Sequence, residues 1–251
     1  MSDEHLIAAA LLVPAVGAGL IACAGRWPNL REAATLTTSL ALCAVILALL
    51  PGVLDGQSPE LVAFEMFPGI AIAFRVEPLG MLFALVASGL WIVNSVYSIG
   101  YMRGNNEAHQ TRFYTCFALA LSATMGIALA SNLLTLFLFY ELLTLVTWPL
   151  VAHHGDEQAR KGGRVYLGVL LGTSLGLLLL VWFIWRGIWY YFPLALIVGY
   201  AFAWFAHFVV EKNEPATFKY PLWSFISDYK MMWYMITGRM NAEVERVVKP
   251  N

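Results

Sequence analysis

Long apolar segments with few charged residues recur along the chain, and they constrain its fold more than any other feature of the sequence. A helix needs about 20 predominantly apolar residues to cross the hydrocarbon core of a bilayer. Seven segments meet this requirement, at residues 5–24, 33–53, 76–99, 112–130, 132–152, 165–185 and 190–210. Turn-forming sequences such as GRWPN and PGVLDGQSPE lie between them. The pattern predicts an all-α, polytopic helical membrane protein with about seven transmembrane helices.

The composition supports this fold class and excludes some functions. Charged residues make up 12% of the 251 residues, compared with about a quarter in a soluble domain. The formal net charge of −1 leaves no basic surface for a nucleic-acid partner. The three cysteines have no metal-ligand or disulfide spacing and are expected to be small buried apolar residues. The acidic start, MSDEH, argues against a cleaved secretory signal.

The distribution of Lys and Arg predicts the orientation, because these residues are enriched in cytoplasmic loops. If the N-terminus lies outside and seven spans alternate, 13 of the 15 Lys and Arg residues fall on the cytoplasmic side. Only Arg75 and Arg186 then fall outside. The sequence therefore predicts an external N-terminus and a cytoplasmic C-terminal tail.

The tail after residue 211 is rich in aromatic residues and methionines, as in FKYPLWSFISDYKMMWYMITGRM. One interpretation is a helix that lies in the membrane interface, where Trp and Tyr settle at headgroup level. The alternative is a tail that packs on the cytoplasmic ends of the helices. The sequence leaves both open.

Glu141 is the candidate catalytic residue, as a proton relay, because it lies in the middle of the apolar segment LFLFYELLTLVTW. A charged carboxylate at the bilayer centre is costly, and acids inside spans are usually functional. The plainer interpretation is a protonated Glu that bonds a neighbouring helix. Thr144 is three residues further on, shares the same helical face and could bond Glu141.

Four blocks up to about residue 180 resemble the antiporter-like, proton-translocating subunits of respiratory complex I and of Mrp-type cation/proton antiporters. The blocks are FRVEPLGMLFALV at 74–86, VYSIGYMRG at 96–104, SNLLTLFLFYELLTLVTWPLVAH at 131–153 and KGGRVYLGVLLGTS at 161–174. In that family a Glu in the fifth span pairs with a Lys two spans later and participates in proton transfer. The resemblance implies this role for Glu141 and a bacterial inner membrane as location.

The chain departs from this family after Gly172, because no predicted span then contains a lysine. A charged partner of Glu141 would have to come from another chain, or from a cytoplasmic-end residue such as Lys161 or Arg164. A complete proton channel within this chain alone is therefore not expected.

The C-terminal part resembles a second family, the small membrane proteins related to the fungal 2-hydroxy-fatty-acid dioxygenase. The block AHFVVEKNEPATFKYPLWS carries this resemblance. Several histidines are thought to hold iron in that family, and only His207 matches here. His207 and Glu211 lie four residues apart and could start an iron site, with His153 and His154 as further candidates, or they could simply cap the helix. The predicted division is 1–171 and 172–251.

Small residues on the sixth span predict contact with another subunit, because such residues let membrane helices approach closely. Gly168, Gly172 and Gly176 recur at four-residue spacing, and Thr173 lies beside them. The expected partners are other membrane subunits and lipids. Three functions stay open: a proton-relaying subunit of a respiratory or ion-transport complex, a non-catalytic accessory subunit, or an iron-dependent lipid oxygenase.

Overall fold

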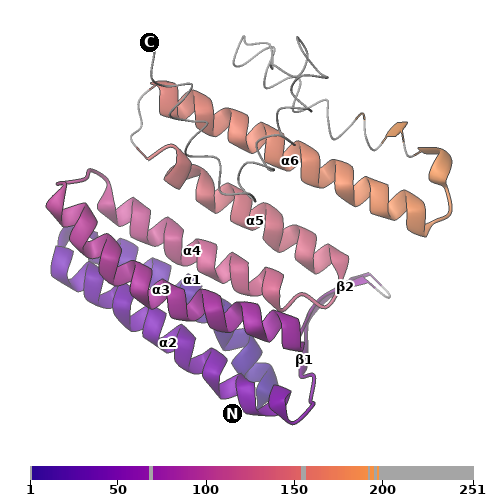
Figure 1. Cartoon of the computed structure of the whole chain (residues 1–251), viewed down its shortest axis with the longest axis horizontal. Coiled ribbons are helices and arrows are strands. Elements are labelled where there is room, and N and C mark those ends of the chain that lie inside the picture. Colours follow the sequence, from indigo (N-terminus) through magenta and orange to yellow (C-terminus); the bar gives the residue numbers. More distant parts are fainter. Residues whose placement is uncertain (1, 68–69, 154–156, 192, 195–196, 198–251) are drawn as a thin grey trace, which may run out of the picture. The chain divides into compact units, whose positions relative to one another are not determined.

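The computed structural model describes residues 2–67, 70–153, 157–191, 193–194 and 197 (Figure 1). Six long helices follow one another in the described residues: α1 Asp3–Cys23, α2 Pro28–Leu54, α3 Pro78–Gly104, α4 Gln110–Ala128, α5 Leu133–Val151 and α6 Glu157–Trp185. Two strands, β1 Glu60–Phe67 and β2 Ile70–Arg75, lie between α2 and α3, and short 3-10 turns occupy Ala24–Arg26 and Trp189–Tyr191. The prediction of a polytopic helical membrane protein is confirmed.

Five of these helices are long and apolar enough to cross a membrane: α1, α2, α3, α5 and α6. Helix α4 also forms where a span was predicted, but its sequence is less apolar because it carries Thr, Ser, Gln and Arg residues. Its 19 residues would extend for about 28 Å at 1.5 Å per residue. The predicted span at 190–210 lies almost entirely outside the described residues. The count of seven and the orientation therefore stay predictions.

Helix α4 tolerates its polar residues because other helices surround it. It packs against α1 and α5 and also contacts α3. Tyr114, Ala118 and Met125 on α4 are almost completely buried, and the Ser122 hydroxyl donates to the Leu11 carbonyl of α1 at 2.7 Å. A side chain at Gly126 would collide with the Phe139 ring of α5, so this glycine lets α4 and α5 approach closely.

The segment between α2 and α3, where the sequence predicts only a turn-forming connection, forms a β-hairpin. Strands β1 and β2 pair antiparallel from Glu60–Arg75 to Phe67–Ile70, with two irregularities in β1. Backbone bonds join β2 to the α4–α5 connection: the Arg75 amide donates to Leu129 at 2.7 Å and the Ser131 amide donates to Ala73 at 3.0 Å. The hairpin thus anchors the start of α5.

A buried charged cluster joins α2, α3 and α4 at their other ends. Glu32 on α2 accepts from Arg103 on α3 at 2.6 and 2.8 Å, and from its neighbour Arg31 at 3.4 Å. The Arg31 guanidinium also donates to Gln110 at 2.7 Å and lies 5.4 Å from the Tyr114 ring centroid. Arg31 lies outside the predicted spans, where loop charges are expected, but it is buried and holds helices together.

The contacts define two ends of the helical bundle. The hairpin end contains β1, β2, the α4–α5 connection and the end of α6, where Ala71, Asn132 and Arg186 line one cavity. The arginine end contains Arg31, Arg103 and Gln110, and also the α5–α6 connection, because Arg112 donates to the His153 carbonyl at 2.6 Å. Arg75 and Arg186 therefore lie at the same end, as the predicted alternation of spans requires.

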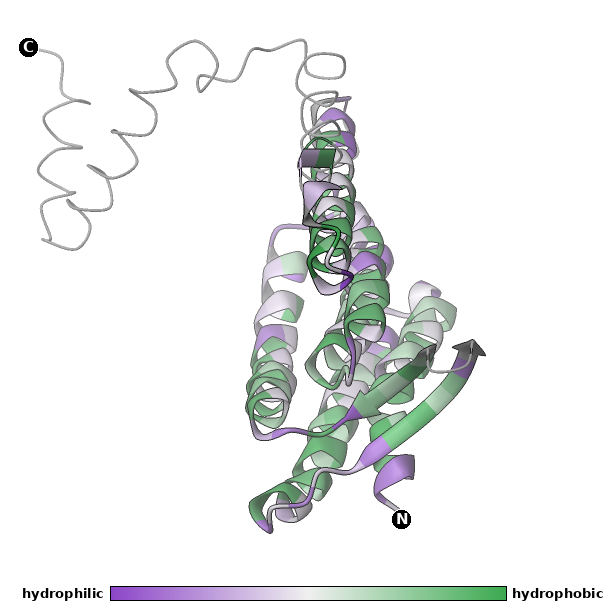
Figure 2. Ribbon diagram, turned by 90° about the vertical axis from the view of Figure 1, so that its right-hand side faces the viewer, coloured by the Kyte–Doolittle hydropathy of each residue, from purple (hydrophilic) through white to green (hydrophobic). Residues whose placement is uncertain are grey.

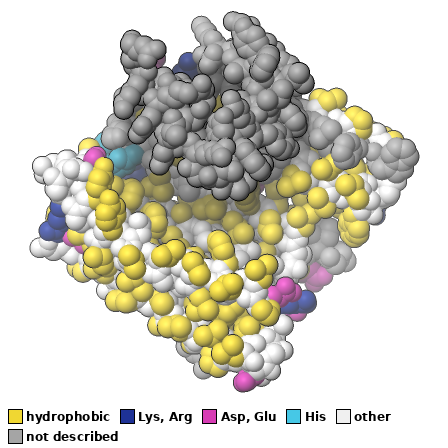
Figure 3. Space-filling model, in the orientation of Figure 1, with side chains coloured by type: hydrophobic (Ala, Val, Ile, Leu, Met, Phe, Trp, Pro, Cys, Tyr) yellow, Lys and Arg dark blue, Asp and Glu magenta, His cyan; other side chains and the backbone are white. Residues whose placement is uncertain are grey.

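The outer faces of the helices are apolar. Leu40, Leu82, Leu90 and Val93 are among the large hydrophobic residues that are more than half exposed. Hydrophobic residues run along the helices in Figure 2, with hydrophilic residues mainly near the helix ends. Figure 3 shows hydrophobic side chains spread over the face formed by α2 and α3. Such a continuous apolar surface requires lipid or another membrane subunit to cover it.

Candidate proton-relay site on helix α5

The position of α5 is fixed at its first turn. The Asn132 side chain caps the helix by accepting from the Thr135 amide at 2.9 Å, and its own amide group donates to the Ala71 carbonyl of β2 at 2.9 Å. The fully buried Thr135 hydroxyl accepts from the Ala73 amide at 3.1 Å. Two of these side-chain hydrogen bonds, to Ala71 and Ala73, therefore set where α5 begins relative to the hairpin.

Glu141 lies near the middle of α5 and faces α6. Its Oε1 atom accepts a short hydrogen bond from the Ser174 hydroxyl of α6. Its Oε2 atom is buried and has no hydrogen-bond partner among the described residues. A buried acceptor of this kind is costly unless it is protonated, hydrated or bonded by a further group. One oxygen is therefore held by Ser174, and the other has no hydrogen-bond partner among the described residues.

The polar neighbours of Glu141 differ from the prediction. Thr144 is buried on the same helix, but its hydroxyl donates to the Tyr140 carbonyl at 3.1 Å, as Ser and Thr commonly do inside membrane helices. The proposed bond between Thr144 and Glu141 is therefore wrong for this structure. Ser174, which does bond Glu141, is the last residue of the block KGGRVYLGVLLGTS and has no predicted site role. It is 33 residues away in sequence, and helical spacing alone cannot indicate it.

A second polar contact joins α5 and α6 closer to the arginine end. The Thr147 and Tyr166 hydroxyls are 2.9 Å apart. Gly163 lies against the Trp148 indole, since an added Cβ would be 2.7 Å from Nε1. The α5–α6 interface is thus polar at two levels, Glu141–Ser174 and Thr147–Tyr166, with small residues allowing close approach.

The predicted packing residues lie on the same helix α6. Gly172 and Gly176 are buried and Gly168 is partly buried. Thr173 is exposed, and its hydroxyl donates to the Val169 carbonyl at 2.8 Å. Contact of these residues with another subunit stays a prediction.

No Lys or Arg pairs with Glu141 in the part of the chain that the structure describes. Lys161 and Arg164 lie in the first turns of α6, ten or more residues before Ser174. At 1.5 Å per residue this separation is about 15–20 Å. Among the described residues, Glu141 therefore has no cationic partner.

The predicted iron ligands His207 and Glu211 lie outside the described residues, as does His154. His153 is described, and its ring contacts Phe113 with 6.0 Å between ring centroids. Within the described ranges, the His, Cys, Asp and Glu side chains form no group of three that could hold a metal ion. The described residues therefore do not by themselves fit an iron centre, and the iron site stays a prediction.

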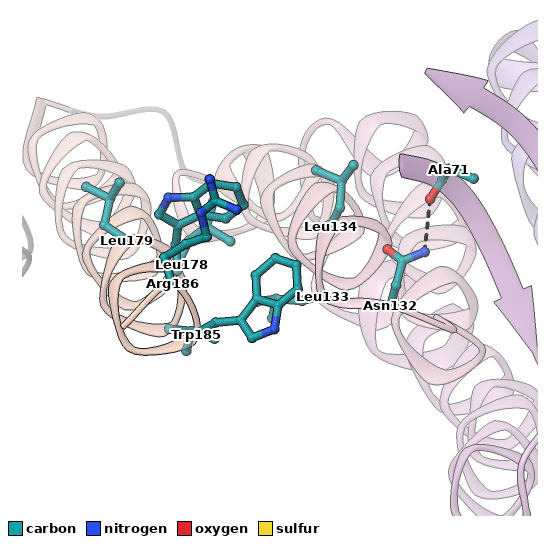
Figure 4. Close-up of a pocket in the computed structure, with 10 residues that line it drawn as sticks. Ala71, Asn132, Leu133, Leu134, Leu178, Leu179, Trp185 and Arg186 are labelled. Atoms are coloured by element: carbon teal, nitrogen blue, oxygen red, sulfur yellow. Dashed lines mark hydrogen bonds between the residues drawn. The ribbon is translucent and has the colours of Figure 1, made fainter. Parts of the chain in front are cut away.

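Two grooves continue from Ser174 towards the hairpin end along the interface of α5 and α6. The nearer one has a volume of about 300 Å³ and includes Phe137, Tyr140 and Ser174 in its lining. The farther one has a volume of about 780 Å³ and extends to Asn132, Trp185 and Arg186. Both are lined by Leu133, Leu178 and Val181. In Figure 4, Trp185 on α6 extends towards Leu133, close to Asn132 and its bond to Ala71.

These observations define the class of protein: a polytopic helical membrane protein with a carboxylic acid held between two of its membrane helices. Comparisons with known proteins resolve the class further. Residues 68–114 match the family model for the N-terminus of chain 5 of NADH-ubiquinone oxidoreductase (complex I). Residues 168–240 match the family model described as 2-hydroxy-palmitic acid dioxygenase Mpo1-like. Both predicted resemblances are confirmed.

Part of the chain is similar in sequence to curated Na(+)/H(+) antiporter subunits. The chain is 32% identical over 117 residues to the Na(+)/H(+) antiporter subunit A1 of Staphylococcus aureus (strain bovine RF122 / ET3-1), and 31% identical to that of strain JH9. Each match covers 45% of this chain and 14% of the relative. The chain therefore spans about a seventh of the length of these relatives.

The fold is similar to a subunit of a solved respiratory assembly. The structure of the membrane-bound sulfane sulfur reductase (MBS), an archaeal respiratory membrane complex, matches with a TM-score of 0.59 at 18% sequence identity. The match covers 71% of this chain and 27% of that chain. The match shows that this chain shares its fold with a chain of that complex.

Proposed function

We propose that this chain is a subunit of a respiratory or cation-transporting membrane complex, in which Glu141 relays protons within the bilayer. The observation that carries the proposal is the carboxyl group of Glu141, held at Oε1 by Ser174 and buried without a partner at Oε2 among the described residues. A carboxyl held in one position and without a partner at its second oxygen can gain and lose a proton when a cation or water approaches.

The similarity to antiporter subunit A1 and to a respiratory-complex subunit supports a partner-dependent role. The chain corresponds to only 14% and 27% of these proteins, and it offers no described cation to Glu141. In this proposal further membrane subunits contribute to the proton path, in a bacterial inner membrane with the N-terminus outside. The exposed apolar faces of the helices give such subunits a surface to contact.

The test starts with the assembly. The tagged chain is extracted from its native membrane in mild detergent, and native mass spectrometry identifies the membrane subunits that co-purify. The assembly is then reconstituted into liposomes, and proton uptake is followed with a pH-sensitive dye. The Glu141→Gln variant keeps the size and a hydrogen-bonding group but cannot release a proton.

We expect Glu141→Gln to lower the rate of proton uptake at least tenfold with unchanged assembly, because the relay carboxyl is lost. Ser174→Ala should lower it less, since it removes only the group that positions Glu141. Glu60→Gln is the matched control, because Glu60 is an exposed acid in the hairpin. Normal uptake by the Glu141→Gln assembly would leave the accessory, purely structural role as the function of this chain.

A further inference from the structure

The two grooves between α5 and α6 form one apolar slot, which we call the α5–α6 slot. It is lined by Leu133, Leu178 and Val181 over the stretch that the two grooves share. It starts at Ser174, beside Glu141, and ends at Arg186 at the hairpin end. Twelve residues of α6 separate Ser174 from Arg186, which corresponds to about 18 Å along the helix.

The end of the slot has the chemistry of a membrane interface. Trp182 and Trp185 are exposed there and pack edge to face, with 5.8 Å between ring centroids. The Arg186 guanidinium carbon lies 5.5 Å from the Trp182 ring centroid. No acidic side chain of the described residues forms an ion pair with Arg186, whereas Arg75 at the same end pairs with Glu60 at 3.2 Å. Trp at headgroup level beside a cation is typical of the bilayer boundary.

We infer that the α5–α6 slot binds one anionic phospholipid, with an acyl chain along Leu133, Leu178 and Val181 and the phosphate on Arg186. The length of the slot supports this occupant, because one leaflet of a bilayer core is about 15 Å thick, half of the 30 Å total. Arg186 at the mouth, which pairs with no acid of the described residues, supplies the charge complementarity.

A lipid bound in the α5–α6 slot would limit the access of water to Glu141. The inner end of the acyl chain would reach Ser174, the residue that bonds Glu141. An apolar chain there excludes water between the hairpin end and the acid. Glu141 would then exchange protons only from the arginine end or from a partner subunit. The binding inference itself does not depend on the proposed proton relay.

The test measures lipid binding to the purified full-length chain by native mass spectrometry, with phosphatidylglycerol and phosphatidylcholine as probes. We expect phosphatidylglycerol to bind more tightly than phosphatidylcholine. Arg186→Gln should weaken phosphatidylglycerol binding about fivefold, the effect of one cation near a lipid headgroup, and remove the preference for the anionic lipid. Arg75→Gln is the matched control, because it removes a cation at the same end that already has a partner, and it should leave binding unchanged.

A second measurement locates the acyl chain. Phosphatidylglycerol with a diazirine near the end of its acyl chain should crosslink to peptides containing residues 133–140 and 173–186. Equal loss of binding in Arg75→Gln and Arg186→Gln, or crosslinks confined to other helices, would overturn the inference. So would a photo-crosslinking residue placed at position 178 that captured polypeptide instead of lipid, whether from another subunit or from residues 198–251 of this chain. None of these results would bear on the Glu141→Gln test of proton uptake.

Discussion

Removal of Glu32 should destabilise the protein far more than removal of any exposed acid. The Glu32 side chain is 8% exposed and lies between Arg31, which is 6% exposed, and Arg103, which is 46% exposed. Glu32→Ala leaves the buried Arg31 guanidinium without its counter-charge. Breaking a buried ion pair in this way costs about 3–5 kcal/mol. We expect a value near the lower limit, about 3 kcal/mol, because Arg103 can be hydrated and Arg31 keeps its bond to Gln110.

The exposed ion pair of the hairpin provides an internal comparison. Glu60 and Arg75 are 43% and 44% exposed and 3.2 Å apart, and an exposed pair of this kind contributes about 0–1 kcal/mol. Thermal unfolding of the detergent-solubilised protein, followed by tryptophan fluorescence, separates the two cases. At 2–4 °C per kcal/mol for a protein of this size, Glu32→Ala should lower Tm by about 6–12 °C. Glu60→Ala should lower it by at most about 4 °C.

Two further variants test why Glu32→Ala lowers the stability of the protein. Glu32→Gln keeps an acceptor for Arg103 without the charge and should fall between wild type and Glu32→Ala. Replacing both Glu32 and Arg31 by apolar residues should recover part of the lost stability, because no unpaired buried charge then remains. If Glu32→Ala and Glu60→Ala lowered Tm equally, the cluster would not stabilise the bundle by charge pairing, and the reasoning would be refuted.

Two other predictions concern the hairpin and the iron hypothesis. Thr135→Val leaves the buried Ala73 amide without its acceptor, which should lower the free energy of unfolding by about 1–3 kcal/mol. The lower Tm should be accompanied by faster amide hydrogen exchange of residues 70–75. An unchanged exchange rate would contradict the anchoring role of Thr135. If His207 and Glu211 take part in an iron site, protein purified after growth with iron should contain about one iron per chain by elemental analysis. The His207→Ala variant should lose this iron, and the control variant His5→Ala should keep it. Iron-free wild-type protein from such a preparation would end the oxygenase hypothesis.

The helices of this chain could be predicted from the sequence because each apolar run specifies its own local structure. The run at 33–53 became α2, Pro28–Leu54, and Asn132 begins α5 as a capping residue does. The β-hairpin at 60–75 could not be found in this way. Its strands are fixed by Thr135 and Asn132, which lie about 60 residues further along the chain.

Only the local part of the candidate site could be predicted from the sequence. An acid within an apolar run can be recognised from sequence, and Glu141 does lie within a helix at an interface. Its hydrogen-bond partner could not be recognised, because Ser174 on α6 depends on how two helices pack. Arg31 was interpreted as a loop charge for the corresponding reason, since its burial depends on Glu32, Gln110 and Tyr114.

The hydrogen bonds between the hairpin and the start of α5 have a consequence for how this subunit can move. Asn132 and Thr135 tie the first turn of α5 to β2, so the helix has one clamped end, like a beam fixed in a wall. Displacement of a clamped beam grows with distance from the support. Glu141 lies nine residues from Asn132, about 14 Å along the axis, so a bend of α5 would displace it less than the opposite end of the helix. That opposite end is held by contacts with α4 and α6 instead, through Arg112 and Tyr166, so a neighbouring subunit that shifted α6 would act on the helix there first.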